Sequence, residues 1–158
     1  MNDSKRKMKK ERTLIIIKPD GVKKKLVGEC LKRFENAGFE IVALKVTKLK
    51  KSFLKKFYKH LKEKLRPKLF DAIIAYMCSG KVVIAILERE NAVALARKIC
   101  GATNPREAEK GTIRGDFATD DLIERAKKNK ATRNIIHASS SVKEAKEEIR
   151  IVSKLVGK

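Results

Sequence analysis

The order of apolar and polar residues along the chain predicts four β-strands. Two runs, Thr13–Ile17 and Lys81–Leu87, are apolar at consecutive rather than alternate positions, which is typical of strands covered on both faces. Glu40 to about Leu49 alternates and becomes more polar toward its end, and Asn134–Ala138 is a short apolar run; both predict further strands. The first strand should stop at Lys18–Gly21, because proline cannot continue a ladder and Asp-Gly suits a turn.

Between these strands, apolar residues recur at helical spacing and predict helices. The stretch Val27–Ala37 is an example, with Leu31 and Phe34 on its apolar face. The other predicted helices span residues 52–65, 69–78, 91–100 and 121–130, and a last one begins at Val142. This order of elements fits a βαββαβ arrangement of the α/β class, an α+β sandwich in which helices pack on a four-stranded, largely antiparallel sheet.

Length and the distribution of charge predict one domain preceded by a short arm. A chain of 158 residues fits a single compact domain. Residues 1–11 are almost all polar or charged, so we expect a basic, disordered arm followed by a folded domain over residues 12–158. Within the domain, Thr103–Phe117 is rich in glycine, proline, threonine and charge and predicts a long loop. In a small domain, a loop of that length more often has a function than serves only as a connection.

The composition restricts the partners and the location of the protein. Forty Lys and Arg against nineteen Asp and Glu leave a formal charge of +21, which raises the local concentration of anions such as nucleotides, nucleic acid or acidic lipid. Cys30, Cys78 and Cys100 are odd in number and in no metal-ligand spacing, so we expect reduced thiols and a cytoplasmic protein. The apolar run Leu14–Ile17 is too short for a signal sequence, and no stretch could span a bilayer, so we expect no membrane partner.

His137, at the end of a short apolar run, is the first candidate for chemistry. By itself it is ambiguous, because a lone histidine at a strand end is more often structural than catalytic. If the last helix begins at Val142, Glu148 falls on the edge of its inward stripe, whereas Glu144 faces outward. A carboxylate on the packed side needs a partner. The chain can fold back to bring Glu148 to His137 with Ser139 between them, and such a pair orients an imidazole for nucleophilic attack.

Other polar residues between the predicted elements are of the kinds that bind phosphate. Arginine can hold phosphate oxygens through two hydrogen bonds, lysine offers a point charge, and a glycine-rich loop offers backbone N–H groups. The chain supplies Lys18 at a strand end, Arg97 on a helix, Thr103 after it, and Arg114 within Gly111–Asp116. Each is unremarkable alone, but together they predict a polyphosphate site.

Four segments, in matching order and spacing, resemble the signatures of the nucleoside diphosphate kinases. They are Thr13–Val22 (TLIIIKPDGV), Gly101–Pro105 (GATNP), Gly111–Phe117 (GTIRGDF) and Asn134–Ser141 (NIIHASSS), and the resemblance extends over roughly residues 12–150. It implies a ferredoxin-like fold and a ping-pong reaction, in which the γ-phosphoryl group of a nucleoside triphosphate such as ATP passes through a phosphohistidine to a nucleoside diphosphate. It also implies nucleoside di- and triphosphates as partners and a homo-oligomer.

The same resemblance implies roles for individual residues. His137 matches the phosphorylated histidine, and Glu148 with Ser139 matches the pair that orients it. The residues that match positions contacting the phosphates and the ribose are Lys18, Tyr58, Arg97, Thr103, Arg114 and Asn134. Mg²⁺ would bridge the phosphates of the nucleotide. No acidic cluster in the sequence resembles a dedicated metal site, which agrees with a metal ion carried in by the substrate.

The sequence departs from the family pattern in four places. Where the family usually has an aromatic residue that stacks on the base, alignment back from Tyr76 selects Leu69, and a shift of one residue selects Phe70. Ser140 stands where the family usually has aspartate. Residues 118–133 run about ten residues longer than the common pattern and lead directly into the strand that carries the histidine. The sequence also lacks most of the family's aromatic-rich C-terminal tail, which bears on the expected oligomer.

Two further hypotheses assign the excess positive charge differently. A family relative with an impaired kinase site could act mainly by binding nucleic acid non-specifically, with a steep salt dependence from counterion release. Aromatic residues are only 5% of the chain and do not alternate with lysine or arginine, which argues against a stacking platform for bases. Alternatively, all proteins of the source organism are rich in lysine, as in some thermophiles, and the positive charge of this chain does not reflect a binding partner.

Overall fold

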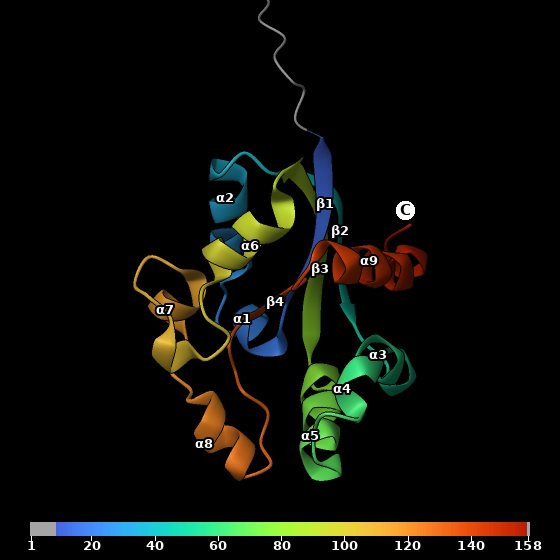
Figure 1. Ribbon diagram of the computed structural model, residues 1–158, viewed down its shortest axis with the longest axis vertical. Coiled ribbons are helices and arrows are strands. Elements are labelled where there is room, and N and C mark those ends of the chain that lie inside the picture. Colours follow the sequence, from blue (N-terminus) through green and yellow to red (C-terminus); the bar gives the residue numbers. More distant parts are fainter. Residues whose placement is uncertain (1–8, 158) are drawn as a thin grey trace, which may run out of the picture.

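The structure, a computed structural model, describes residues 9–157, which contain a four-stranded antiparallel sheet (Figure 1). The strands are β1 (Lys10–Ile17), β2 (Glu40–Lys48), β3 (Lys81–Glu90) and β4 (Ile136–Ala138). Their order in the sheet is β2–β3–β1–β4, and every neighbouring pair is antiparallel. This arrangement confirms the predicted α+β sandwich of ferredoxin-like type.

Helices occupy the connections between the strands. They are α1 (Pro19–Lys23), α2 (Val27–Asn36), α3 (Lys51–Phe57), α4 (Lys59–Lys62), α5 (Pro67–Cys78), α6 (Ala92–Cys100), α7 (Ile113–Phe117), α8 (Leu122–Lys127) and α9 (Val142–Val156), with a 3-10 turn, η1 (Pro105–Glu107). Over residues 9–157, no helix is long and apolar enough to cross a membrane. The last helix begins where predicted, because the Ser141 side chain accepts a hydrogen bond from the backbone N–H of Glu144.

Both faces of the sheet are covered. Figure 1 shows α2 and α6 on one side and α3 and α9 on the other. Ile15 and Ile17 of β1 pack into the core beneath α2 and α6, whereas Leu14 and Ile16 pack into the core beneath α3, α5 and α9. All four side chains have 0% exposure. Two cores on opposite faces explain why β1 is apolar at consecutive positions.

Several predicted boundaries differ from the structure, and the predicted loop Thr103–Phe117 contains η1 and α7. The strand β1 begins at Lys10, because Lys10 pairs with Glu90 across the sheet. Residues 10 and 11 of the predicted arm therefore belong to the sheet, and residues 1–8 lie outside the described residues. The predicted helix 52–65 is interrupted at Tyr58, where α3 ends and α4 begins. The segment after β1 does end the strand, but it continues as the short helix α1 with Pro19 in its first turn.

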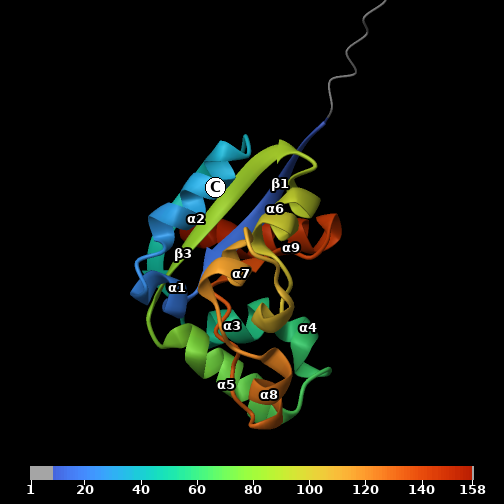
Figure 2. The ribbon, with the colours of Figure 1, turned by 90° about the vertical axis from the view of Figure 1, so that its left-hand side faces the viewer.

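The inserted segment, residues 118–133, forms α8 and the loop that leads into β4. In both ribbon views α8 lies at the same end of the molecule as α4 and α5 (Figures 1 and 2). Leu122, Ala126 and Ala131 of the insertion line the same cavity as His137.

Candidate active site

His137 lines a cavity of about 510 Å³, which we call the histidine cleft. The cleft lies between α4 and α5 on one side and the inserted segment on the other, and it is also bordered by α6 and α9. Its volume falls within the range of small-molecule sites. Every predicted site residue except Ser139 lines it: Lys18, Tyr58, Leu69, Arg97, Thr103, Arg114, Asn134, His137 and Glu148.

A buried carboxylate holds the imidazole of His137. Its Nε2 lies 2.7 Å from Oε1 of Glu148, a residue that is only 4% exposed. Since a carboxylate accepts hydrogen bonds, Nε2 is the donor in this contact, and in the neutral imidazole Nδ1 then carries the lone pair. Nδ1 makes no hydrogen bond to the described residues. The contact therefore fixes both the tautomer and the orientation of a ring that has one nucleophilic nitrogen.

Ser139 lies behind this pair and orients the carboxylate. Its hydroxyl donates to Oε1 of Glu148 over 2.9 Å, and it accepts from the backbone N–H of Leu14 over 3.3 Å. Ser139 is fully buried, which explains why it does not line the cleft. Glu148 is thereby tied to the central strand β1.

Ser140 makes a different contact. Its hydroxyl donates to the Glu144 carboxylate one turn into α9, and both residues line the cleft. Glu144 lies outside the buried stripe of α9, as predicted, and its carboxylate contacts Ser140 at the exposed border of the cleft. At the position where the family pattern has aspartate, this protein places a hydroxyl beside the carboxylate of Glu144.

Two aromatic rings fix the side of His137 that faces the sheet core. Phe57 and Tyr58 lie edge-on to the imidazole, with ring centroids 5.4 and 6.4 Å away. Burial, and then the nearby charge of Glu148, raise the pKa of the Tyr58 phenol, so it stays neutral at physiological pH. The imidazole is therefore packed on one side and open to the cleft on the other, with 18% of its side chain exposed.

Asn134 joins two other predicted phosphate-binding residues. Its Oδ1 accepts from Nζ of Lys18 over 2.7 Å, and its Nδ2 donates to the carbonyl oxygen of Thr103 over 2.9 Å. Burial, and then the positive charge of Arg114, lower the pKa of the Lys18 ammonium to about 8, while Asp20 opposes the shift. An amine with this pKa is still mostly charged near pH 7. It can therefore form an ion pair with an anion that enters the cleft.

Arg114 is held by three backbone carbonyls. Its guanidinium donates to the carbonyl oxygens of Gly101, Asn134 and Ile136, over 2.8, 3.3 and 2.6 Å. The side chain is only 6% exposed, and burial lowers the pKa of the guanidinium without neutralising it. Arg114 therefore fastens the end of α6 and the start of β4 together while its charge remains at the cleft.

Arg97 and Thr103 are exposed at the rim of the histidine cleft. Arg97 lies in the last turn of α6, and its guanidinium makes no hydrogen bond or ion pair with residues 9–157. Its five N–H donors are thus available to an anion in the cleft, unlike those of Arg114.

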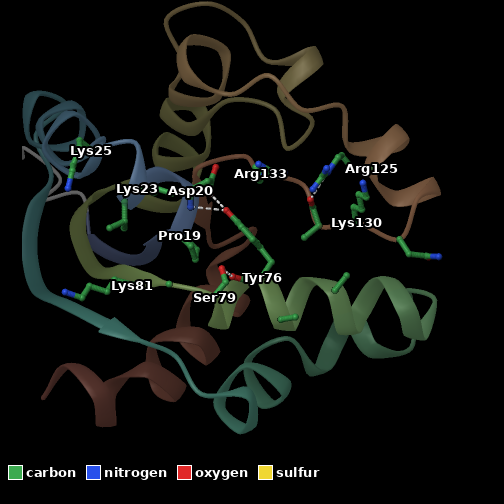
Figure 3. Close-up of a pocket in the computed structure, with 16 residues that line it drawn as sticks. Pro19, Asp20, Lys23, Lys25, Tyr76, Ser79, Lys81, Arg125, Lys130 and Arg133 are labelled. Atoms are coloured by element: carbon green, nitrogen blue, oxygen red, sulfur yellow. Dashed lines mark hydrogen bonds between the residues drawn. The ribbon is translucent and has the colours of Figure 1, made fainter.

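Asp20, which the sequence did not single out, positions the residue before β4. Its carboxylate accepts from the backbone N–H of Ile135 over 3.0 Å and from the Tyr76 hydroxyl, a contact visible in Figure 3. Ile135 has a φ of +73°, a left-handed conformation that is strained for a β-branched residue. Gly21 permits the close approach, since a Cβ there would lie 2.9 Å from the Ile135 carbonyl oxygen. This network holds the chain in the path that turns His137 into the cleft.

We expect Asp20→Ala to lower the free energy of unfolding by about 2–4 kcal/mol, because the Ile135 N–H and the Tyr76 hydroxyl would both lose a buried acceptor. Urea unfolding followed by circular dichroism measures the change. Asp71→Ala, an exposed carboxylate on α5, is the matched control and should stay within about 0.5 kcal/mol of the parent. Equal unfolding midpoints for the two variants would contradict the role of Asp20.

The structure distinguishes between the two residues considered for contact with the base. Leu69 lines the histidine cleft, whereas Phe70 is 4% exposed and packs in the core beneath α3, α5 and α9. The first turn of α5 therefore presents an aliphatic side chain to the cleft, and the aromatic ring serves the core.

A second, larger cavity of about 880 Å³ lies on the other side of Tyr76 and does not include His137 (Figure 3). Its walls carry exposed basic side chains such as Lys23, Lys81 and Arg133. Size alone would favour this cavity, but its one acidic residue, Asp20, is engaged with Ile135 and Tyr76. The histidine that is bound to a carboxylate and the buried cations lie in the histidine cleft, which makes this cleft the candidate active site.

Within residues 9–157, no group of three or more histidine, cysteine, aspartate or glutamate side chains is placed to hold a metal ion. The cleft instead offers Lys18, Arg97 and Arg114 to an anion. This donor set suits the phosphates of a nucleotide, which can themselves bind a divalent cation.

A histidine oriented by a buried carboxylate, beside cationic side chains in a cavity of nucleotide size, defines a phosphotransferase that acts on nucleotides. Comparison with known proteins identifies the family. The family model for nucleoside diphosphate kinase matches residues 11–155. The chain is 46% identical over 145 residues to the nucleoside diphosphate kinase of Methanocaldococcus jannaschii, covering 92% of this chain and 94% of that protein. The protein therefore belongs to the nucleoside diphosphate kinase family and is an enzyme of phosphoryl transfer between nucleoside tri- and diphosphates.

Solved structures agree with this assignment. A transition-state mimic of the nucleoside diphosphate kinase from Borrelia burgdorferi, with bound vanadate and ADP, has a TM-score of 0.85 and 34% identity, covering 90% of this chain and 86% of that chain. An enzyme of the same family from Pyrobaculum aerophilum has a TM-score of 0.81 and 34% identity, covering 90% of this chain and 95% of that chain. The match in fold thus covers nearly the whole chain.

Proposed function

We propose that Nδ1 of His137 is the nucleophile of the phosphoryl transfer, which proceeds in two half-reactions. In the first, the Nδ1 lone pair attacks the γ-phosphorus of a nucleoside triphosphate, and the bond from that phosphorus to the bridging oxygen breaks. The electron pair of that broken bond stays on the bridging oxygen, which becomes a terminal phosphate oxygen of the departing nucleoside diphosphate. In the second, a terminal oxygen of another nucleoside diphosphate attacks the phosphorus, and the pair of the N–P bond returns to Nδ1.

The observation that carries this proposal is the contact between Nε2 of His137 and Glu148. It leaves Nδ1 as the nitrogen with a free lone pair. The ring itself is held in place by its edge-on packing with Phe57. The positive charge that develops on the imidazole as Nδ1 bonds to phosphorus is offset by the Glu148 carboxylate. No proton needs to leave the ring, because Nε2 keeps its hydrogen throughout.

The cationic residues of the cleft are proposed to hold the phosphates. Lys18, Arg97 and Arg114 supply positive charge where charge spreads over the transferred group. Asn134 positions Lys18, and Tyr58, Thr103 and Leu69 complete the contacts to the nucleoside and phosphates. Mg²⁺ would enter bound to the phosphates of ATP or another triphosphate and would offset part of their negative charge. The bound vanadate and ADP of the related Borrelia structure support a site of this charge.

Radiolabelling tests the proposed intermediate. The protein incubated with Mg²⁺ and [γ-³²P]ATP should take up label that is lost in acid and retained in base, as a phosphoramidate bond requires. Adding ADP, GDP, CDP or UDP to the isolated labelled protein should transfer the label to the corresponding triphosphate. Label that survives acid, or that no diphosphate removes, would contradict the mechanism.

The lowered pKa of Lys18 predicts that nucleotide affinity falls as the pH rises. The ammonium form binds phosphate, and in the free enzyme this form is lost as the pH rises through about 8. Bound phosphate favours the charged lysine, so between about pH 8 and 9.5 binding of ADP takes up a proton and weakens as the pH increases. Isothermal titration calorimetry in buffers of different ionisation enthalpy measures both effects.

Lys18→Arg is the matched control, because the guanidinium stays charged over this range. Its ADP affinity should be independent of pH between 8 and 9.5. If the parent protein and the arginine variant showed the same pH dependence, Lys18 would not be the titrating group.

Assembly, location and nucleic-acid binding stay predictions. A homo-oligomer is supported by the edge strand β2, whose Leu44 and Val46 are 49% and 58% exposed beside unpaired backbone groups. Cys30, Cys78 and Cys100 are free thiols, which supports the cytoplasmic location. The charge of +21 favours salt-dependent, non-specific contact with nucleic acid as a secondary property.

A further inference from the structure

The larger cavity, of about 880 Å³, has no part in the proposed phosphoryl transfer and is rich in basic side chains. We call it the basic cavity. Its lining includes Lys23, Lys25, Lys81, Arg125, Lys130 and Arg133. These residues come from α1 and the turn after it, from the start of β3, and from the inserted segment. The fold therefore gathers positive charge from three separate parts of the chain around one hollow.

Most of this charge is not balanced within the protein. The side-chain nitrogens of all these residues except Arg125 make no hydrogen bond or ion pair with residues 9–157. The acidic residue among the lining residues is Asp20, and its carboxylate already accepts from the N–H of Ile135 and from the Tyr76 hydroxyl. A concave surface with excess positive charge raises the local concentration of anions.

The guanidinium of Arg125 is held in a fixed position at the cavity. Its Nε donates to the carbonyl oxygen of Ala131 over 3.0 Å and lies 3.5 Å from Oδ2 of Asp120. The same Asp120 oxygen accepts from the backbone N–H of Arg133 over 2.9 Å. These contacts leave the two terminal nitrogens of Arg125 without a partner among residues 9–157. A guanidinium positioned in this way can donate two hydrogen bonds to one phosphate group.

The space between the cations stays open because α5 presents short side chains to it. Ala72, Ala75 and Ser79 line the cavity together with Tyr76, and their spacing places them on one face of the helix. The Tyr76 hydroxyl is bound to Asp20, so this ring is held against the wall. The hollow is therefore a property of the packed helix.

The cations lie on two sides of the basic cavity. In Figure 3, Lys23, Lys25 and Lys81 lie at the left of the view, and Arg125 and Lys130 lie at the right. A single phosphate group is too small to contact both sides at once. An anion with several phosphate groups can accept hydrogen bonds from both, and such charge-assisted hydrogen bonds are stronger than neutral ones.

We propose that the basic cavity binds a compact anion that carries three or more phosphate groups, at a site separate from that of the nucleotide. The ammonium groups on one side and the guanidinium groups on the other donate to its phosphate oxygens. A second copy of the chain is a poor occupant, because it would bring another formal charge of +21 to a cationic surface.

The test measures the binding of three probes by isothermal titration calorimetry at physiological ionic strength. Tripolyphosphate is a linear anion of the proposed class, inositol hexakisphosphate is a ring-shaped one, and orthophosphate carries a single phosphate group. Saturating ADP is present throughout, so that the histidine cleft is filled before a probe is added. The tighter of the two larger probes identifies the shape of anion that the cavity prefers.

The cavity variant carries Lys23→Gln, Lys25→Gln and Lys81→Gln. Lys130 is kept, because it also lines the histidine cleft. The control variant carries the same change at three exposed lysines that line neither cavity, which are Lys32, Lys55 and Lys127. Both variants lose the same formal charge, so a difference between them cannot arise from net charge alone.

In the parent protein, at least one of the two larger probes should bind with one site per chain, and orthophosphate should bind about tenfold more weakly or worse. The cavity variant should bind that larger probe about tenfold more weakly or worse, because three charged donors are lost, and the control should stay within about twofold. Binding of ADP and labelling by [γ-³²P]ATP should stay within about twofold in both variants, since none of the changed residues lines the histidine cleft. Thermal unfolding checks that both variants fold.

The proposal is overturned if neither larger probe binds while ADP fills the cleft, if the two variants lose affinity equally, or if orthophosphate binds as tightly as the larger anions. A second ADP per chain that the cavity variant alone loses would overturn it in favour of a second nucleotide site. Sedimentation velocity supplies the last check. A change of assembly state in the cavity variant alone would overturn the proposal in favour of a contact between copies of the chain.

Discussion

His137→Gln should take up no phosphate from [γ-³²P]ATP and should lose phosphotransfer activity by on the order of 10⁴-fold or more. Glutamine preserves the size and polarity of the side chain but has no nitrogen lone pair able to attack phosphorus. The fold should be unaffected, because 18% of the His137 side chain is exposed and Glu148 keeps the hydrogen bond from Ser139. Filter binding of labelled protein and a coupled ATP–GDP assay measure the two losses.

The chain contains one other histidine, which makes a direct control possible. His60 is exposed and also lines the histidine cleft, in α4. Its imidazole makes no hydrogen bond to a carboxylate within residues 9–157, whereas that of His137 does. His60→Gln should keep both label and activity close to those of the parent. Acid-labile label that remained in His137→Gln and disappeared in His60→Gln would reassign the nucleophile.

Arg114→Met should reduce stability and activity together. Three buried carbonyl oxygens, of Gly101, Asn134 and Ile136, would lose a charged donor, which should cost about 3–5 kcal/mol of the free energy of unfolding. The loss of its positive charge from the cleft should lower phosphotransfer by about 10²–10³-fold. Urea unfolding and the coupled assay, run under conditions where the variant stays folded, separate the two effects.

Arg106→Met is the matched control for this change. Arg106 pairs with Asp121 at 3.1 Å, but 74% of its side chain is exposed, so the pair should contribute less than about 1 kcal/mol. Activity should remain near that of the parent, since Arg106 does not line the histidine cleft. Comparable stability losses in the two variants would mean that the carbonyl contacts of Arg114 are not the cause.

Local patterns in the sequence predicted those parts of the site in which the contacting residues are close together in the chain. The distance from His137 to Glu148 is eleven residues, and a turn followed by a capped helix determines where the carboxylate falls. The Ser139 contact follows from the same few residues. Periodicity placed Lys18 after a buried strand and Arg97 near the end of a helix, but it carried no information on how far apart their side chains lie.

The residues that sequence reasoning missed act over long separations. Asp20 and Tyr76 are 56 residues apart, and their contact supports Ile135 in a left-handed conformation that no propensity predicts for isoleucine. The one signal available was Asp20-Gly21 after a strand, which was interpreted as a turn. Glu144 was correctly placed outside the buried stripe of α9, but helical spacing alone does not show that Ser140 lies beside it.

The sequence by itself determined the four strands, most of the helices and the βαββαβ order. It could do so because apolar residues repeat every two positions in a half-buried strand and every three to four in a half-buried helix. It also determined which histidine has a carboxylate within reach. Only the tertiary structure decided that Leu69 rather than Phe70 faces the cleft, that Arg114 is bound to three carbonyls, and that the insertion crosses to Arg66. Those contacts join segments that are distant in the chain, and the path that brings them together is set by how the helices pack on the two faces of the sheet.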